Sequence, residues 1–180
     1  MSPRQGAVST DRRGTTERRV ALRPLSEADL SLIGPWYGRA TAAVAGLRTG
    51  RAEADLRRHL EEARSEPDRA LLAITLAEGE EVAGLLDRRA PYPVAGWLTV
   101  GFLALAEPCR GRGLGSEAVL ALEEDTRRRG LARHFAAGVV ADAGRALYFW
   151  LRLGYRPLLQ AHLPWPSPRE GVVWMVRETE

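Results

Sequence analysis

The stretch from Cys109 to Ser116, which reads CRGRGLGS, carries the clearest chemistry in the chain. It follows an apolar run, 97–105, and opens an amphipathic segment, 116–129. Its glycines allow positive φ and a close approach of the backbone to a ligand, and the first amides of the following helix have no partner inside that helix. These amides, the helix dipole and two arginines favour a bound anion, typically a phosphate. The predicted anion-binding residues are Arg110, Gly111, Arg112, Gly113, Leu114, Gly115 and Ser116.

The spacing within this glycine turn separates several interpretations. A nucleoside-triphosphate loop would end in Gly-Lys-Ser/Thr, and that ending is missing. A dinucleotide-binding turn would read G-x-G-x-x-G with an acidic residue about twenty positions further on, but 131–135 reads LARHF. A plain tight turn without a ligand stays open as the alternative.

Hydrophobic periodicity and turn signals predict the elements that position the glycine turn. The predicted strands cover 18–23, 70–77, 82–86, 95–105, 135–140, 155–159 and 171–177, and the predicted helices cover 26–33, 51–66, 116–129 and 143–153. A break or kink is expected at Gly34-Pro35, just after the first helical segment. A hairpin and a long strand, followed by strand–helix units, imply one α/β (α+β) domain with a mixed sheet and helices on both faces.

Composition favours one folded domain of a soluble protein. The chain has 180 residues, is 45% hydrophobic and carries a formal net charge of +3. This excess lies in 1–19, so we expect a disordered arginine-rich tail over 1–17, a domain over 18–180, and no nucleic-acid partner for that near-neutral domain. No apolar run is long enough to cross a membrane, and no secretory signal is recognised. A single cysteine excludes an internal disulfide, which favours the cytoplasm.

The pattern Arg110-x-x-Gly113-x-Gly115, after a strand and before a helix, resembles the pyrophosphate loop Q/R-x-x-G-x-G/A of the GNAT superfamily, the acyl-CoA-dependent N-acetyltransferases. The element order over 18–178 is similar to the fold of that family. The resemblance implies a mostly antiparallel sheet of six to seven strands that splays into a V between 95–105 and 133–141. It also implies acetyl-CoA as co-substrate, with its pyrophosphate on the glycine turn. Backbone groups of Leu103, Ala104 and Leu105 would hold the pantetheine and polarise the thioester carbonyl.

A second family motif, N-x-x-A-x-x-(F/L)-Y-x-x-x-G-F, is matched only in part by 143–155. Ala143 stands where the family often has Asn, and Trp150 stands where it commonly has the Tyr that protonates the departing thiolate. An indole N–H is not a usable acid. Tyr148 is two positions away, about 200° around the helix, and is expected to lie on the surface.

The resemblance leaves the proton acceptor and the acceptor pocket open. Glu107 and Asp87 are candidate bases, each with a solvated loop carboxylate as the alternative. Candidates for the pocket, each with core packing as the alternative, are Trp36, Tyr37, Tyr92 and Trp165. His59 is expected to face solvent, and the three scattered histidines argue against a metal.

The resemblance implies an enzyme that transfers an acetyl group from acetyl-CoA to a primary amine of a small molecule or peptide by direct attack. The alternative is an acyl-CoA-binding module with weak or no turnover, which the residues Ala143 and Trp150 motivate. Neither interpretation needs a membrane, and a homodimer stays possible.

Overall fold

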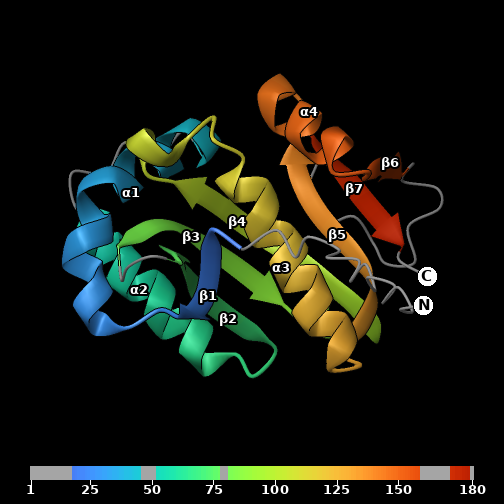
Figure 1. Ribbon diagram of the computed structural model, residues 1–180, viewed down its shortest axis with the longest axis horizontal. Coiled ribbons are helices and arrows are strands. Elements are labelled where there is room, and N and C mark those ends of the chain that lie inside the picture. Colours follow the sequence, from blue (N-terminus) through green and yellow to red (C-terminus); the bar gives the residue numbers. More distant parts are fainter. Residues whose placement is uncertain (1–17, 46–51, 78–80, 159–170, 179–180) are drawn as a thin grey trace, which may run out of the picture.

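The computed structural model describes residues 18–45, 52–77, 81–158 and 171–178, built around one seven-stranded sheet of order β1-β2-β3-β4-β5-β7-β6 (Figure 1). The strands are β1 (Val20–Pro24), β2 (Arg69–Leu76), β3 (Val82–Arg89), β4 (Gly96–Leu105), β5 (Ala132–Val140), β6 (Arg156–Leu158) and β7 (Val172–Glu178). The helices are α1 (Leu30–Ala45), α2 (Ala52–Ser65), α3 (Leu114–Arg128) and α4 (Gly144–Arg152), with 3-10 turns at Glu27–Asp29 and Glu107–Cys109. The predicted element order is confirmed, with ends that shift by a few residues.

The sheet splays between its two parallel strands. β4 and β5 pair in parallel, and every other neighbouring pair of strands is antiparallel. The β4–β5 pairing ends at Val100 and Ala137, although β4 continues to Leu105 and β5 to Val140. Beyond that pair the strand tips separate (Figure 1). The predicted mixed, mostly antiparallel sheet with a V between these two strands is therefore confirmed.

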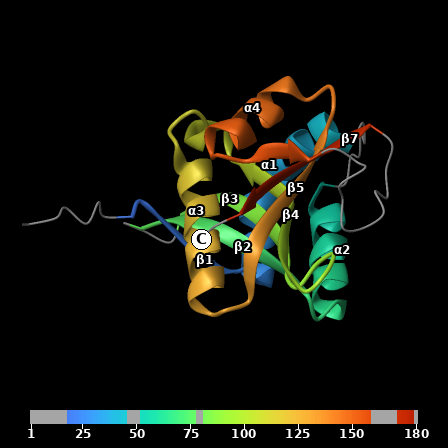
Figure 2. The same cartoon turned by 90° about the vertical axis from the view of Figure 1, so that its right-hand side faces the viewer.

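Helices cover both faces of the sheet, as predicted: α3 lies on one side, and α1 and α2 lie on the other (Figure 2). The core on the α3 side also takes in α4 through Trp150 and is filled by aliphatic and aromatic residues such as Leu114, Val119 and Phe135. The core under α1 and α2 includes Ile33 and Leu56. Burial of these side chains on both faces fixes which side of β4 each of its residues presents.

Of the break or kink expected at Gly34-Pro35, the break is wrong, because α1 runs through Pro35 as one helix. A proline inside a helix removes one backbone hydrogen bond and costs about 3 kcal/mol. The same helix buries Ile33, Trp36 and Tyr37 against α2 and the sheet. Burial of large apolar side chains stabilises by about 1.5–3 kcal/mol each. Packing of this helix face therefore outweighs the local cost of the proline.

A buried polar cluster ties α3 to the far side of the domain. The hydroxyl of Tyr155 donates to Glu123 of α3 at 2.7 Å, and Arg177 of β7 lies 3.1 Å from the same carboxylate. Burial raises the pKa of Glu123, and the Tyr155 hydrogen bond and the Arg177 charge offset part of that effect. The cluster therefore anchors α3, the helix that begins at the glycine turn.

Candidate functional site

The glycine turn leaves a row of backbone amides at the start of α3. Gly111 and Gly113 have φ of 71° and 83°, in the left-handed region that favours glycine. Gly113 caps α3 without a side-chain hydrogen bond, and the first amide bound back to the helix start is that of Glu117, on the Gly113 carbonyl at 3.1 Å. Among the described residues, no acceptor is found for the amides of 111–116. Amides in this arrangement fit the oxygens of a phosphate or pyrophosphate.

Three arginines surround this turn, and sequence analysis identified two of them. Arg110 Nε donates to the backbone carbonyl of Leu105 at 2.9 Å, which ties the turn to the end of β4. Arg112 is exposed. Arg19 donates to the Arg112 carbonyl at 3.0 Å and pairs with Glu117. In the sequence the charge of Arg19 counts with residues 1–19, and only the packing of β1 against α3 brings it to the glycine turn.

Gly115 serves the turn in a different way from Gly113. A Cβ at Gly115 would lie 3.5 Å from Leu105 and from Phe149, so this position faces the packed side of the helix. Gly115 therefore lets α3 approach β4 and α4 closely, while Gly113 permits the left-handed turn itself. Leu114 is buried beside it, and Ser116 is half-buried.

The open edge of β4 begins at a bulge. The register with β3 pairs Phe102 with Asp87 and Val100 with Arg88, so Gly101 is the extra residue. Gly101 of β4 and Gly138 of β5 follow the last paired residues of the two strands, and both are exposed. Neither glycine contributes a side chain to the start of the opening, although a Cβ at Gly138 would lie 3.3 Å from Val172 and 3.7 Å from the Trp174 ring.

Past the bulge, β4 presents alternate residues to its two faces. Leu103 and Leu105 pack on the core of α3, and Phe102 and Ala104 pack on the core of α1 and α2. Within the described part of the chain, residues 101–105 have no partner strand on the β5 side. Backbone amides and carbonyls on that side are therefore available to a ligand, except for the Leu105 carbonyl that Arg110 occupies.

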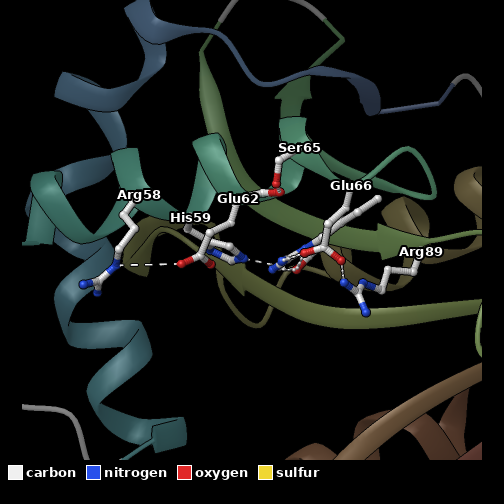
Figure 3. Close-up of polar contacts among 8 residues, drawn as sticks. Arg58, His59, Glu62, Ser65, Glu66 and Arg89 are labelled. Atoms are coloured by element: carbon white, nitrogen blue, oxygen red, sulfur yellow. Dashed lines mark hydrogen bonds and ion pairs between the residues drawn. The ribbon is translucent and has the colours of Figure 1, made fainter.

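A connected polar network lies on the α1 and α2 face beside this bulge, and Figure 3 labels the part of it on and just after α2, including His59 and Glu66. His59 of α2 bridges Tyr37 of α1 and Asp87 of β3, with Nδ1 2.9 Å from the Tyr37 hydroxyl and Nε2 3.1 Å from Asp87 Oδ2. The side chain of His59 is 16% exposed. The expectation that His59 faces solvent is wrong, because the face of α2 that carries it docks on the sheet. The helical pattern of charges around His59 concealed this contact.

Asp87 is held as a carboxylate inside this network. It is 5% exposed and lies within β3, so the alternative of a solvated loop carboxylate does not hold. Arg69 donates to it through Nη2 at 2.8 Å and through Nε at 3.1 Å. Burial alone would raise the pKa of Asp87, but hydrogen bonds from His59 and Arg69 outweigh it and the net pKa is lowered. A carboxylate held in this way orients its neighbours and is a weak proton acceptor.

Further ion pairs surround Arg69 near the end of α2. Glu66 lies 2.9 Å from Arg69 and also pairs with Arg89 at the end of β3, and Figure 3 labels Glu66 and Arg89. On α2 itself, Arg58 lies between Asp55 and Glu62, at 2.9 and 4.0 Å. The buried Asp87 charge is therefore one end of a chain of ion pairs that runs through Arg69 and Glu66 to Arg89.

The other candidate catalytic residues lie elsewhere. Glu107 is exposed in the 3-10 turn after β4. Trp150 is 6% exposed and packs edge-on to Phe149 and against Tyr155, with ring centroids 5.1 and 4.7 Å apart. Tyr148 is 61% exposed, which fits its predicted surface position. Trp150 therefore belongs to the core that packs α4 against the sheet.

The candidate acceptor residues are not brought together. Trp36 is buried in the core under α1, and the Tyr37 hydroxyl is bound to His59. Tyr92 lies in the connection between β3 and β4, beyond the end of β4 opposite the splay, with the Arg89 guanidinium 4.7 Å from its ring centroid. Trp165 lies outside the described residues. Of the four, the structure brings only Tyr37 into the network beside the bulge.

Comparison with known proteins agrees with this geometry. The family model described as acetyltransferase (GNAT) family matches residues 40–155, and the chain belongs to this family. An acetyltransferase from Thermus thermophilus is 26% identical with a TM-score of 0.70, over 89% of this chain and 97% of that one. No curated protein sequence matches the chain.

Two further solved structures share the fold at lower identity. The spermidine N-acetyltransferase from Vibrio cholerae, in complex with CoA and spermine, is 14% identical with a TM-score of 0.67, over 89% of this chain and 95% of that one. The Salmonella typhimurium acetyltransferase that modifies the N-terminal serine of ribosomal protein L7/L12 is 19% identical with a TM-score of 0.71, over 90% and 96%.

Neither a metal centre nor a membrane span is found in the described ranges. Among residues 18–45, 52–77, 81–158 and 171–178, no three His, Cys, Asp or Glu side chains group as metal ligands. In those same ranges, no helix combines the length and apolar character needed to span a membrane.

Proposed function

We propose that this acetyltransferase is an acyl-CoA-dependent N-acyltransferase that moves an acetyl group to a primary amine of a small molecule or of a peptide. The observation that carries the proposal is the row of unpaired amides at Gly111–Ser116, placed at the end of the strand whose edge opens at Gly101. One end of this arrangement suits a pyrophosphate. The other suits an extended amide-containing chain that pairs with a free strand edge.

In this proposal each part of the site has a separate task. Arg112 and the amides of the glycine turn bind the pyrophosphate, and Arg110 orients the turn from the Leu105 carbonyl. The backbone of Leu103 and Ala104 binds the pantetheine, and an amide beside the bulge polarises the thioester carbonyl. The neutral amine enters at the opening flanked by Gly101 and Gly138. Its nitrogen attacks the carbonyl carbon as the C–S bond breaks.

The departing thiolate receives its proton from water in this scheme. Trp150 at the family's Tyr position has only an indole N–H and is buried among aromatic rings. A single general acid typically contributes about 10²–10⁴-fold to a rate. Holding the amine against the thioester contributes more, about 7–11 kcal/mol of the barrier in well-oriented systems. Catalysis therefore does not depend on an acid at this position.

The second candidate function is an acyl-CoA-binding module with weak or no turnover, which the buried Trp150 favours. Calorimetric titration with acetyl-CoA, propionyl-CoA and ATP tests binding, and release of free thiol with spermidine or a serine-initiated peptide tests transfer. Binding of the acyl-CoAs but not ATP, with thiol release that requires an amine, is expected for the enzyme. Binding without amine-dependent release would support the module, and no binding of any acyl-CoA would contradict both.

A further inference from the structure

We propose that Tyr37, His59 and Asp87 form a proton relay that takes the proton the acceptor nitrogen loses when it is acylated. This inference rests on the proposed function and assigns a proton acceptor that neither the family motif nor the two candidate carboxylates supply. Three elements distant in sequence, α1, α2 and β3, build the relay beside the bulge of β4.

The hydrogen bonds of the network determine the protonation of the His59 ring. Asp87 is ionised and accepts hydrogen bonds only, so the His59 Nε2 at 3.1 Å from it carries the proton. Nδ1 of the neutral ring is then an unprotonated acceptor. The Tyr37 hydroxyl, 2.9 Å away, donates to it. In an order of carboxylate, imidazole and hydroxyl, the carboxylate orients the imidazole base and stabilises its protonated form.

The Tyr37 hydroxyl keeps its proton between reaction cycles. Burial, together with the negative charges of Asp55 and Asp87, raises the pKa of Tyr37 to about 12. A hydroxyl with such a pKa does not ionise by itself near neutral pH. It can pass its own proton to His59 Nδ1 while its oxygen takes another, so it serves as a transfer point.

The relay lies beside the opening of the sheet. A Cβ at Gly101 would lie 3.5 Å from Asp87 Oδ2, so the carboxylate borders the exposed glycine that starts the splay. Phe102, the residue after Gly101, contacts both rings edge-on, with centroids 6.0 Å from Tyr37 and 6.4 Å from His59. All these side chains share the sheet face over α1 and α2. Gly101 at the start of the splay therefore borders the Asp87 end of the relay, and the Phe102 ring next to it contacts the Tyr37 ring at the other end.

Charged and titratable groups lie on every element packed around His59. Arg69 on β2 neutralises Asp87 on β3, and α1 contributes the neutral Tyr37. On α2, Asp55 and Glu62 each contact Arg58. The imidazolium formed in the reaction would lie beside the Asp87 carboxylate, 3.1 Å from Nε2, which Arg69 also contacts.

The proton step balances without a further reactant. The nitrogen lone pair forms the C–N bond, and the C–S bond electrons leave with sulfur. The nitrogen's proton passes to the Tyr37 oxygen, directly or across a bridging water, as the Tyr37 proton passes to His59 Nδ1. The imidazolium then returns one proton through Tyr37 to solvent, and the thiolate takes one from water. The amine has lost one proton and the thiol has gained one.

If the same contacts had a purely structural role, substitutions in the network would have different effects on stability and turnover. The network also joins α1, α2 and β3, and loss of a buried hydrogen bond lowers the stability of the fold whatever the function. A structural role predicts lower stability with unchanged turnover in the protein that stays folded. A relay predicts loss of turnover and of its pH dependence, with acyl-CoA affinity unchanged.

The test compares His59→Gln and Tyr37→Phe with His134→Gln as a matched control. His134 is another partly buried histidine; it stacks on Trp97 at the end of β4 away from the splay. Acetyl transfer to spermidine and to a serine-initiated peptide is followed against pH by thiol release, and acetyl-CoA affinity is measured by calorimetry. We expect kcat to fall about 10²-fold or more in both relay variants. We also expect His59→Gln to lose the acid limb, where activity rises as imidazole loses its proton, while affinity and the control stay unchanged.

The outcomes separate the relay from the proposed function. An active wild type whose His59→Gln variant keeps the same kcat or the same acid limb would overturn the relay alone. A wild type that acylates neither amine would overturn the proposed function and the relay with it. Nitrogen-15 spectra of histidine-labelled protein give a second readout without turnover. They should show His59 with its proton on Nε2, a preference lost in Asp87→Asn; a proton on Nδ1 would overturn the relay.

Discussion

Arg110 Nε donates to the backbone carbonyl of Leu105 at 2.9 Å, so the glycine turn is fastened to the open edge of β4. The contact couples the two regions that the proposed function assigns to the two ends of acyl-CoA. Arg110→Gln removes the charge and disturbs this bond, and we expect acetyl-CoA affinity to fall about 10- to 100-fold, since bonds to charged groups contribute about 1.5–3 kcal/mol. Calorimetry checks this, with Arg145→Gln on α4 as the control. Equal affinity in the Arg110 variant would mean that the turn needs no such anchor.

Gly113 and Gly130 provide a matched pair of left-handed glycines at the two ends of α3, with φ of 83° and 68°. Each Glu substitution imposes backbone strain of about 1–3 kcal/mol, so thermal unfolding should show similar losses of stability. Only Gly113→Glu places a carboxylate among the amides of the glycine turn. We therefore expect Gly113→Glu alone to abolish acetyl-CoA binding. Retained binding in Gly113→Glu would remove the basis of the proposed function.

Tyr155→Phe tests the buried cluster that anchors α3. The substitution removes the hydroxyl that donates to Glu123 and leaves Arg177 as the remaining partner of that carboxylate. We expect the free energy of unfolding to fall by about 1–3 kcal/mol. Burial raises the pKa of Glu123, so the folded protein binds its proton more tightly than the unfolded chain does, and this contribution to stability declines as pH rises.

The raised pKa of Glu123 determines how the stability loss in Tyr155→Phe depends on pH. Without the hydroxyl the pKa of Glu123 rises further, so the loss of stability should be larger at about pH 8 than at about pH 4.5. Urea unfolding at both pH values measures it, and an exposed control, Tyr148→Phe, should change little at either. An equal loss at both pH values would mean that the Glu123 charge does not matter.

The contribution of Asp29 to stability depends on pH in the opposite direction to that of Glu123. Hydrogen bonds from Arg23 lower the pKa of Asp29 from 3.8 to about 2, against the effect of burial, and Ser26 donates to the same carboxylate. The stabilising effect is present above about pH 4 and is lost as pH falls through about 2. Asp29→Asn should lower stability at about pH 7 by about 1–3 kcal/mol and flatten the acid dependence of unfolding.

The control for this prediction is Asp142→Asn, an exposed aspartate before α4. Its substitution should leave both the midpoint of urea unfolding at neutral pH and the shape of the acid transition as in wild type. If Asp29→Asn retained the wild-type acid transition, the Arg23–Asp29 pair would carry no pH dependence.

Local patterns in the sequence predicted most of the fold and one half of the candidate site. Periodicity marked the strands and amphipathic helices, and Gly111 and Gly113 marked the turn, because conformational freedom and amide geometry are properties of a few neighbouring residues. Pro35 was predicted wrongly for the same reason. Its local cost is visible in sequence, whereas the burial of Ile33 and Trp36 that outweighs it depends on α2 and the sheet.

The other half of the site was decided only by tertiary structure. His59 stands among charged residues, Tyr37 in an ambiguous stretch and Asp87 beside a loop, and no spacing connects them. Docking of α1 and α2 on the sheet brings the three within hydrogen-bond distance. The opening at Gly101 and Gly138 likewise arises from a change of register between strands. The sequence by itself determined the turn that can bind a phosphate, because its chemistry is local. Packing decided which polar groups meet beside the opening, because those contacts join residues 22 and 28 positions apart.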